Sequence, residues 1–356
     1  VRNAGADLVI FDNALSPSQQ RVLSEELGVQ VLDRAALILD IFAQRARTRE
    51  GRLQVELAQY QYLLPRLIGM WTHLERQGGT SGKGPIGSKG PGETQLETDR
   101  RHIHRKIDKL KAELEEVRRV RGTQRQRRMK NEIPVVAIVG YTNAGKSTLL
   151  NAITGAGIPA NNRLFDTLDT TTRLLTVSDT LDVVISDTVG FIRKLPHALV
   201  SAFRSTLEEA VLADVLVIVN DGASEEIMQQ HDTVVQVLSD LGATEQPRIE
   251  VINKCDLYTD EAGAPMLIPG AVRLSAKTGE GIAELHARIA EQLQKTYAPV
   301  TFVLPFDRFG LVGQIRPLGR VINEEYTDTG LELTVVLANA DRDRLVSKYG
   351  KEILKG

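Results

Sequence analysis

Residues 140–147 combine glycines, a lysine and a serine in the order G-x-x-x-x-G-K-S, between the apolar run 135–139 and a helical pattern. In such a strand–loop–helix setting, glycines let backbone N–H groups surround a phosphate, and the helix N-terminus adds positive partial charge. We expect Lys146 to contact the β- and γ-phosphates and the Ser147 hydroxyl to coordinate Mg²⁺. The predicted phosphate loop consists of Gly140, Tyr141, Thr142, Asn143, Ala144, Gly145, Lys146 and Ser147.

A D-x-x-G motif follows the next apolar run, residues 181–185. An aspartate at the carboxyl end of a strand beside a phosphate loop can hold Mg²⁺ through water, and the following glycine N–H can reach the γ-phosphate. The motif alone is a weak signal, but at this spacing from the phosphate loop it is a strong one. It comprises Asp187, Thr188, Val189 and Gly190.

The base is predicted by an N-K-x-D motif after the apolar run 249–252. The Asp256 carboxylate can accept hydrogen bonds from guanine N1–H and the exocyclic amino group, whereas adenine offers no such pair of donors. Lys254 can lay its apolar stem over the base. A second loop after residues 272–274 can add a backbone N–H. The expected base pocket consists of Asn253, Lys254, Asp256, Ser275, Ala276 and Lys277. We therefore predict a site for GTP or GDP with Mg²⁺.

A segment between the phosphate loop and Asp187 should close over the γ-phosphate and supply a second Mg²⁺ ligand. The candidate segment is Phe165, Asp166, Thr167, Leu168 and Asp169. We choose Thr167 as the ligand because residues 174–177 already begin the next strand, but the residues alone also allow Thr171 or Thr172. We assign catalysis to Lys146, Thr167 and Gly190, and metal binding to Ser147 and Thr167.

The residue after Gly190 is Phe191, where many small GTPases have a glutamine that orients the attacking water. Phe191 cannot orient water, so hydrolysis should depend on Lys146, Mg²⁺ and backbone dipoles. We predict slow turnover by the isolated protein, below about 1 per second, and strong stimulation by a partner that supplies the missing element.

Composition is that of a soluble globular protein with two or three domains, since 42% of the 356 residues are hydrophobic and 25% are charged. No apolar run approaches the roughly 20 residues of a membrane-spanning helix, and no signal-peptide pattern is present. The single cysteine, Cys255, excludes an intrachain disulfide. We predict a cytoplasmic monomer without a transmembrane segment, and the initial Val1 suggests that an N-terminal stretch is missing.

The periodicity predicts an α/β fold in four parts. They are an α/β subdomain with parallel strands at 1–49, an antiparallel helical hairpin at 50–131, a P-loop GTPase domain at 132–297, and a small α/β domain at 298–356. The hairpin is predicted from two heptad seams. The first seam contains Leu53, Leu57, Tyr60, Leu64, Leu67, Trp71 and Leu74, and the second contains Leu96, Ile103, Ile107, Leu110, Leu114 and Val117. Pro65 should kink the first helix.

The connection at 78–92 holds seven glycines and no acidic residue, so it is either a plain flexible connector or a loop that orders against a polyanion. Its G-x-G-x-x-G match is not a dinucleotide fingerprint, because no strand precedes it and Pro85 lies within it. Lys and Arg outnumber Asp and Glu by 13 to 5 in residues 99–130, which favours contact with a phosphate backbone. The predicted RNA contacts are Lys83, Lys89, Arg118, Arg119, Arg121, Arg125, Arg127 and Arg128.

Residues 187–197, with 84–97 and 165–169, resemble the HflX family of GTPases, and the resemblance covers nearly the whole chain. It implies a bacterial, N-terminally shortened member that binds the large ribosomal subunit and splits or rescues stalled ribosomes under stress such as heat. It also implies that the hairpin and its loop reach rRNA near the peptidyl-transferase centre, and that Thr167 joins Ser147 at the Mg²⁺. The alternatives are an ATP-dependent RNA-remodelling protein that uses its N-terminal region, and a switch that binds only a protein partner.

Overall fold

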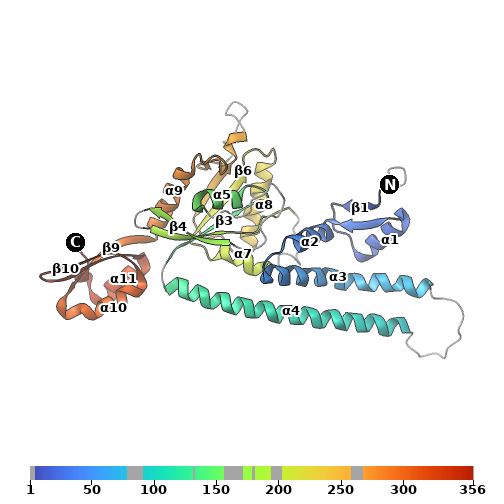
Figure 1. The fold of residues 1–356 in the computed structure, drawn as a ribbon, viewed down its shortest axis with the longest axis horizontal. Coiled ribbons are helices and arrows are strands. Elements are labelled where there is room, and N and C mark those ends of the chain that lie inside the picture. The colour runs from blue at the N-terminus through green and yellow to red at the C-terminus, as the bar shows by residue number, and fades with distance from the viewer. Residues whose placement is uncertain are drawn as a thin grey trace. The chain divides into compact units, whose positions relative to one another are not determined.

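The computed structural model describes residues 5–77, 91–130, 133–155, 171–178, 181–193, 203–257 and 268–355. The chain divides into two compact units. The first combines residues 1–119 with 194–205, and the second combines 120–193 with 206–356. The predicted α/β fold with a P-loop domain is confirmed (Figure 1). Within the described residues, no helix has both the length and the apolar character needed to cross a bilayer.

The first unit begins with a small parallel sheet and two helices. Their bounds are β1 Leu8–Phe11, α1 Pro17–Leu27, β2 Gln30–Asp33 and α2 Arg34–Arg45. The parallel pairing of β1 with β2 confirms the prediction made from the alternation of apolar runs and helical patterns. Helix α1 begins at a capping box, in which the Ser16 side chain accepts a hydrogen bond from the Gln19 N–H, and Pro17 occupies the first turn. It ends at Gly28, whose φ of 67° suits glycine.

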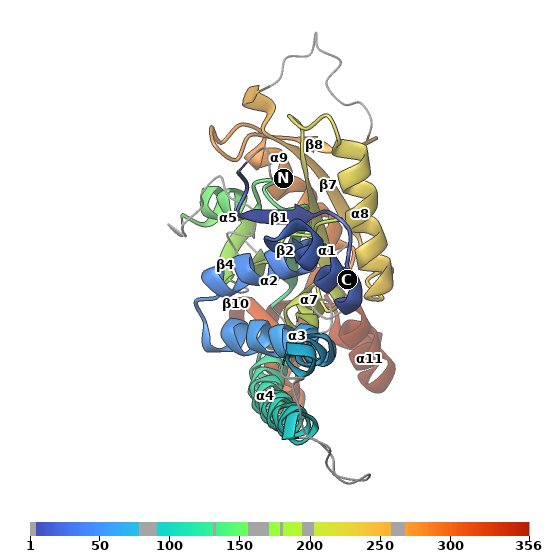
Figure 2. The ribbon, with the colours of Figure 1, turned by 90° about the vertical axis from the view of Figure 1, so that its right-hand side faces the viewer.

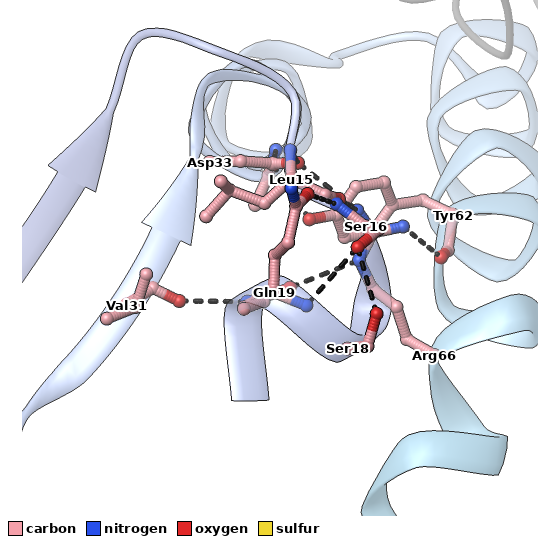
Figure 3. A network of polar contacts seen from close by, with 10 residues as sticks. Leu15, Ser16, Ser18, Gln19, Val31, Asp33, Tyr62 and Arg66 are labelled. Carbon is pink, nitrogen blue, oxygen red and sulfur yellow. Dashed lines mark hydrogen bonds and ion pairs between the residues drawn. The ribbon is translucent and has the colours of Figure 1, made fainter. Parts of the chain in front are cut away.

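A buried carboxylate ties this sheet to the next helix (Figure 3). Asp33 is fully buried, and it accepts hydrogen bonds from the Ala36 N–H at 2.8 Å and from the Leu15 N–H at 3.2 Å. It also accepts from the Tyr62 hydroxyl at 2.8 Å and from Arg66 Nη2 at 3.1 Å. Burial, together with the hydrogen bond to Asp33, raises the pKa of Tyr62. Because a buried charge requires such partners, the network fixes the next helix, α3 Arg49–Gln77, against the sheet.

The predicted helical hairpin is present as α3 Arg49–Gln77 and α4 Pro91–Lys130. The two helices are antiparallel (Figure 1). Accordingly, Lys106 Nζ donates to the Tyr60 hydroxyl at 2.7 Å, and Arg49 pairs with Glu113 at 3.3 Å. Pro65 lies inside α3 without ending it. The heptad seams form one cluster, whose buried members are Leu53, Leu57, Ile103, Ile107, Leu110 and Leu114, with Tyr60, Leu64 and Leu67 packed against it. Trp71, Leu74 and Leu96 have side chains outside the described part of the structure.

A residue from much later in the sequence completes the first unit. The rings of Phe42 in α2 and Phe203 pack edge to face, with their centroids 5.1 Å apart and an interplanar angle of 79°. Both are almost fully buried, at 1% and 2% exposed. Edge-to-face aromatic pairs of this kind stabilise a core beyond the area they bury. The core of the first unit is therefore discontinuous in sequence.

The second unit is built on a six-stranded sheet in the order β4-β5-β3-β6-β7-β8, in which only β4 is antiparallel to its neighbour. The strands are β3 Val135–Gly140, β4 Thr171–Ser178, β5 Leu181–Asp187, β6 Val215–Asp221, β7 Arg248–Asn253 and β8 Val272–Arg273. The helices are α5 Lys146–Thr154, α7 Arg204–Val211, α8 Ile227–Asp240 and α9 Ile282–Gln294. Helices α5 and α9 pack into the same core as the strands. Ile227 of α8 packs with Ile252 of β7, and α8 runs beside β7 in Figure 2. The central strands are continuous apolar runs because helices cover both faces.

An antiparallel sheet in the order β10-β11-β9 ends the chain. Its elements are β9 Tyr297–Pro305, α10 Val312–Ile315, β10 Gly319–Thr327, β11 Gly330–Ala338 and α11 Asn339–Tyr349. The sheet has its own core around Phe302 and Leu333, but Val336 packs into the core of the six-stranded sheet. The predicted domain boundaries stay predictions.

Candidate nucleotide-binding site

The phosphate loop needs glycine at two positions for reasons of space and conformation. Gly140 ends β3 with φ of 156°, and a Cβ there would lie 2.3 Å from the Val219 carbonyl oxygen. Gly145 has φ of 94°, and its Cβ would lie 2.2 Å from Asn253 Nδ2. Only glycine adopts these backbones at such close approach. The loop therefore passes directly from β3 to α5, which begins at Lys146, as the motif predicts.

Lys146 is buried at the start of α5, with 6% of its surface exposed. Its ammonium group donates to the Tyr141 carbonyl oxygen at 2.9 Å. Burial lowers the pKa of Lys146 to about 8, and the nearby Asp187 carboxylate opposes that shift. A cation that is buried away from water interacts strongly with a phosphate anion, because the effective dielectric constant there is low.

Oxygen donors for a metal meet beside this lysine. The Ser147 hydroxyl donates to Asp187 Oδ2 at 2.6 Å, and Asp187 is 1% exposed at the end of β5. A hydroxyl and a carboxylate are hard oxygen donors of the kind that Mg²⁺ takes alongside phosphate and water. The residues present therefore fit Mg²⁺, which when bound neutralises charge on the phosphates. Thr188 is buried, and its hydroxyl donates to the Ile138 carbonyl oxygen at 2.8 Å.

The D-x-x-G motif lies directly on the phosphate loop. The Phe191 N–H donates to the Gly140 carbonyl oxygen at 3.1 Å, and the Thr142 N–H donates to the Phe191 carbonyl oxygen at 2.8 Å. A Cβ on Gly190 would lie 2.8 Å from Thr142 Cα and 3.1 Å from Lys146 Nζ. The Phe191 side chain is 1% exposed, so it belongs to the core. Phe191 therefore holds the motif in place through its backbone and its packing.

Asn253 joins the phosphate end of the site to the base end. Its Nδ2 donates to the Ala144 carbonyl oxygen at 2.8 Å, and its Oδ1 accepts from the Ala276 N–H at 2.9 Å. The side chain is 2% exposed, so both bonds are made away from water. One amide thus fixes the distance between the two loops that the sequence assigned to one nucleotide.

The base end centres on the Asp256 carboxylate. Its Oδ1 accepts from the Ser275 hydroxyl at 2.7 Å, and its Oδ2 lies 4.0 Å from Lys277 Nζ. Ser275 is fully buried, so its hydroxyl holds the carboxylate in one orientation. The Asp256 side chain is 17% exposed, which leaves the carboxylate accessible to a donor pair on a base.

Asp221, the last residue of β6, was not among the predicted site residues. Its Oδ2 lies 2.6 Å from Lys254 Nζ, although the two residues are far apart in the chain. The sequence did carry a signal for it, because an acidic residue at the end of a buried strand is also what identified Asp187. Without a partner motif, however, Asp221 had no assigned role.

Other predicted residues are only partly placed. Val189 is buried at 6% exposed, and Asn143 has a positive φ of 63° within the loop. Thr171 and Thr172 lie in β4 opposite Asp187 and Ser186. The predicted closing segment, Phe165, Asp166, Thr167, Leu168 and Asp169, lies outside the described residues.

The predicted RNA contacts are described at two positions. Arg118 pairs with Glu115 at 3.5 Å and Arg119 pairs with Glu116 at 2.8 Å, each one turn apart on α4. Both arginine side chains remain exposed, at 40% and 76%. Lys83 and Lys89 lie outside the described residues, and so do the side chains of Arg121, Arg125, Arg127 and Arg128.

The class of this protein follows from the mostly parallel sheet, the phosphate loop that requires glycine at two positions, and the Asn253 bridge between the two loops: it is a P-loop GTPase. Three family profiles match in succession: "GTP-binding GTPase N-terminal" over residues 1–43, "GTP-binding GTPase Middle Region" over 45–128, and "50S ribosome-binding GTPase" over 135–254. "GTPase HflX" of Caldanaerobacter subterraneus is 47% identical over 97% of this chain and 79% of its own length. "GTPase HflX" of Escherichia coli is 48% identical over 86% and 71%. The chain belongs to the HflX family.

Two solved structures are similar at lower identity. The "crystal structure of SsGBP and GDP complex" is 26% identical, covers 81% of this chain and 82% of its own, and has a TM-score of 0.46. A GTP-binding protein from Sulfolobus solfataricus in complex with GDP is 25% identical over 82% of each chain, with a TM-score of 0.44.

As a member of a GTPase family, the chain binds GTP and GDP with Mg²⁺ and hydrolyses GTP.

Proposed function

We propose that this chain binds the large ribosomal subunit through rRNA and splits or rescues stalled ribosomes under stress, with ribosome-stimulated hydrolysis of GTP to GDP and phosphate. The observation that carries the proposal is the match of the nucleotide domain to a family described as 50S ribosome-binding GTPases, within a chain of the HflX family. This function requires a cytoplasmic, ribosome-associated protein, and we propose that it acts as a monomer.

The charge of α4 supports an RNA partner. Even with Arg118 and Arg119 paired to glutamates, the sequence from Arg121 to the end of the helix adds five Lys or Arg residues and no acidic one. Such a run is the electrostatic footprint of phosphate contact, which weakens steeply with salt.

The burial of Phe191 supports a need for the partner. Because its side chain packs in the core, it leaves no polar group at that position to orient water. We propose slow turnover by the free protein and an element supplied or positioned by the ribosome.

The test is GTP turnover with and without purified large subunits. We expect the subunits to stimulate turnover, and we expect the triple variant R125E/R127E/R128E to lose that stimulation while it keeps basal turnover. The matched control R342E/R344E/K348E reverses three charges on α11 and should keep it. No stimulation of the unchanged protein, or equal loss in both variants, would contradict the proposal. Splitting itself is followed as loss of whole ribosomes on a sucrose gradient.

The alternative, an ATP-dependent RNA-remodelling protein, has no support from the matched families and relatives. Replacing Lys146 with Ala should abolish GTP turnover. ATP hydrolysis that survives this change would require a second nucleotide site.

A further inference from the structure

The ammonium group of Lys254 is anchored by a carboxylate from the neighbouring strand. Lys254 Nζ lies 2.6 Å from Asp221 Oδ2, and the side chains are only 23% and 17% exposed. Asp221 ends β6 and is the register partner of Asn253 in β7, so the pair joins two neighbouring strands at their carboxyl ends.

The carboxylate of Asp221 is itself held in one orientation. Its Oδ1 accepts from the Ala223 N–H at 3.1 Å, which leaves Oδ2 to face the lysine. The Gly222 N–H donates to the Asn253 carbonyl oxygen at 2.9 Å, so the turn after β6 is fixed to the end of β7. Asp221 is thus a rigid acceptor on a fixed turn.

Lys254 also has an uncommon backbone. Its φ is 67°, a left-handed conformation that a non-glycine residue adopts only when its surroundings impose it. The Leu257 N–H donates to the Lys254 carbonyl oxygen at 2.9 Å. With the backbone set at one end and the ammonium at the other, the four-carbon stem between them has few remaining rotamers.

We propose that Asp221 is a positioning residue for guanine-nucleotide binding, which holds the Lys254 stem as a preformed apolar wall for the face of the purine. This rests on the assignment of Lys254 and Asp256 to the base pocket. A stem that contacts the ring face does not read exocyclic groups. Asp221 therefore strengthens binding of GDP and of inosine diphosphate equally, while Asp256 reads the 2-amino group that inosine lacks.

The test measures the affinities of GDP and of inosine diphosphate in variants of the full chain. D221N keeps the acceptor for the Ala223 N–H but removes the charge. We expect it to weaken both nucleotides by about tenfold, with their affinity ratio unchanged. D221E should recover part of the loss. D182N, which removes the charge from the Asp182–Arg320 pair in the same unit, is the control and should leave both affinities unchanged.

Two further variants distinguish a failure of the role of Asp221 from a failure of the base-pocket assignment. K254M keeps an apolar stem without the charge, so adding D221N to K254M should cause no further loss if Asp221 acts through Lys254. Additive losses, or a D221N protein that binds GDP like the unchanged chain, would overturn the inference. D256N should change the ratio of the two affinities. If D256N has no effect either, the base-pocket assignment fails rather than the role of Asp221.

Discussion

The buried ammonium of Lys146 should make the nucleotide-free protein less stable than it would be without this lysine. Folding moves the pKa of Lys146 from 10.5 to about 8, chiefly because burial penalises the charged form. At about 1.4 kcal/mol per pKa unit, keeping Lys146 charged in the folded state near neutral pH costs about 3 kcal/mol. Lys146→Met removes the charge at similar volume, so we expect the nucleotide-free variant to be more stable by up to that amount.

The direction in which the stability of the unchanged protein changes with pH follows from proton binding at Lys146. Between the folded pKa of about 8 and the unfolded pKa of 10.5, the unfolded chain binds more protons at Lys146, so the unchanged protein gains stability as pH rises. The advantage of Lys146→Met should therefore be full below the folded pKa and shrink through this window.

The assay is urea unfolding of nucleotide-free protein at several pH values, repeated with saturating GDP. GDP should reverse the order, because only the unchanged protein gains the free energy of tight binding. Lys254→Met is the control, since that lysine is ion-paired, and its loss should not stabilise the protein. A Lys146→Met protein less stable than the unchanged chain near neutral pH, or a difference independent of pH, would show that burying the charged ammonium carries no such cost.

Further predictions concern hydrogen-bonded, closely packed and ion-paired residues of the second unit. Asn253→Ala leaves the two backbone groups it bonds without a partner, so GDP should bind at least tenfold weaker, about 1.4 kcal/mol, in a fluorescence titration. Asn220→Ala, at a buried asparagine in the same sheet, should lower the free energy of unfolding without that loss of affinity. Gly190→Ala forces its Cβ against the phosphate loop, and single-turnover GTP hydrolysis should fall about 10²-fold. Glu250 raises the pKa of His231 above 6.5, so the stability that His231 adds over His231→Gln should be full below pH 6.5 and decline as pH rises through the folded pKa.

A different result would contradict each of these predictions. Equal GDP affinity in the two asparagine variants would show that the bridge between the loops does not matter for binding. Unchanged hydrolysis in Gly190→Ala would mean that the loop yields to the added methyl group at no cost. A pH-independent difference for His231→Gln in urea unfolding would show that its pair with Glu250 carries no net free energy.

The features that the sequence predicted best are those with a fixed local spacing. The seam from Leu53 to Leu57 and from Ile103 to Leu114 follows from the heptad alone, and it forms one core. The polar motifs come together because parallel strands end at one edge of a sheet, which is how Lys146 and Asp187 could be paired in advance.

The features that it did not predict depend on contacts between distant segments. Nothing near Phe203 indicates that its ring packs on Phe42, because that pairing is decided by tertiary structure. The ion pairs of Arg118 and Arg119 were readable from their spacing to Glu115 and Glu116, but counting charges along the helix overlooked them.

The packing of Phe203 on Phe42 sets an order of events during synthesis. A growing chain that has completed α2, the hairpin and β3 still lacks the ring that covers Phe42, and this ring emerges only after β5 has been made. A fragment ending at residue 119 would expose that aromatic surface to water and invite aggregation. Excised versions of the first unit should therefore carry residues 194–205 joined back by a designed linker, and the nucleotide domain cannot be removed as a simple C-terminal truncation.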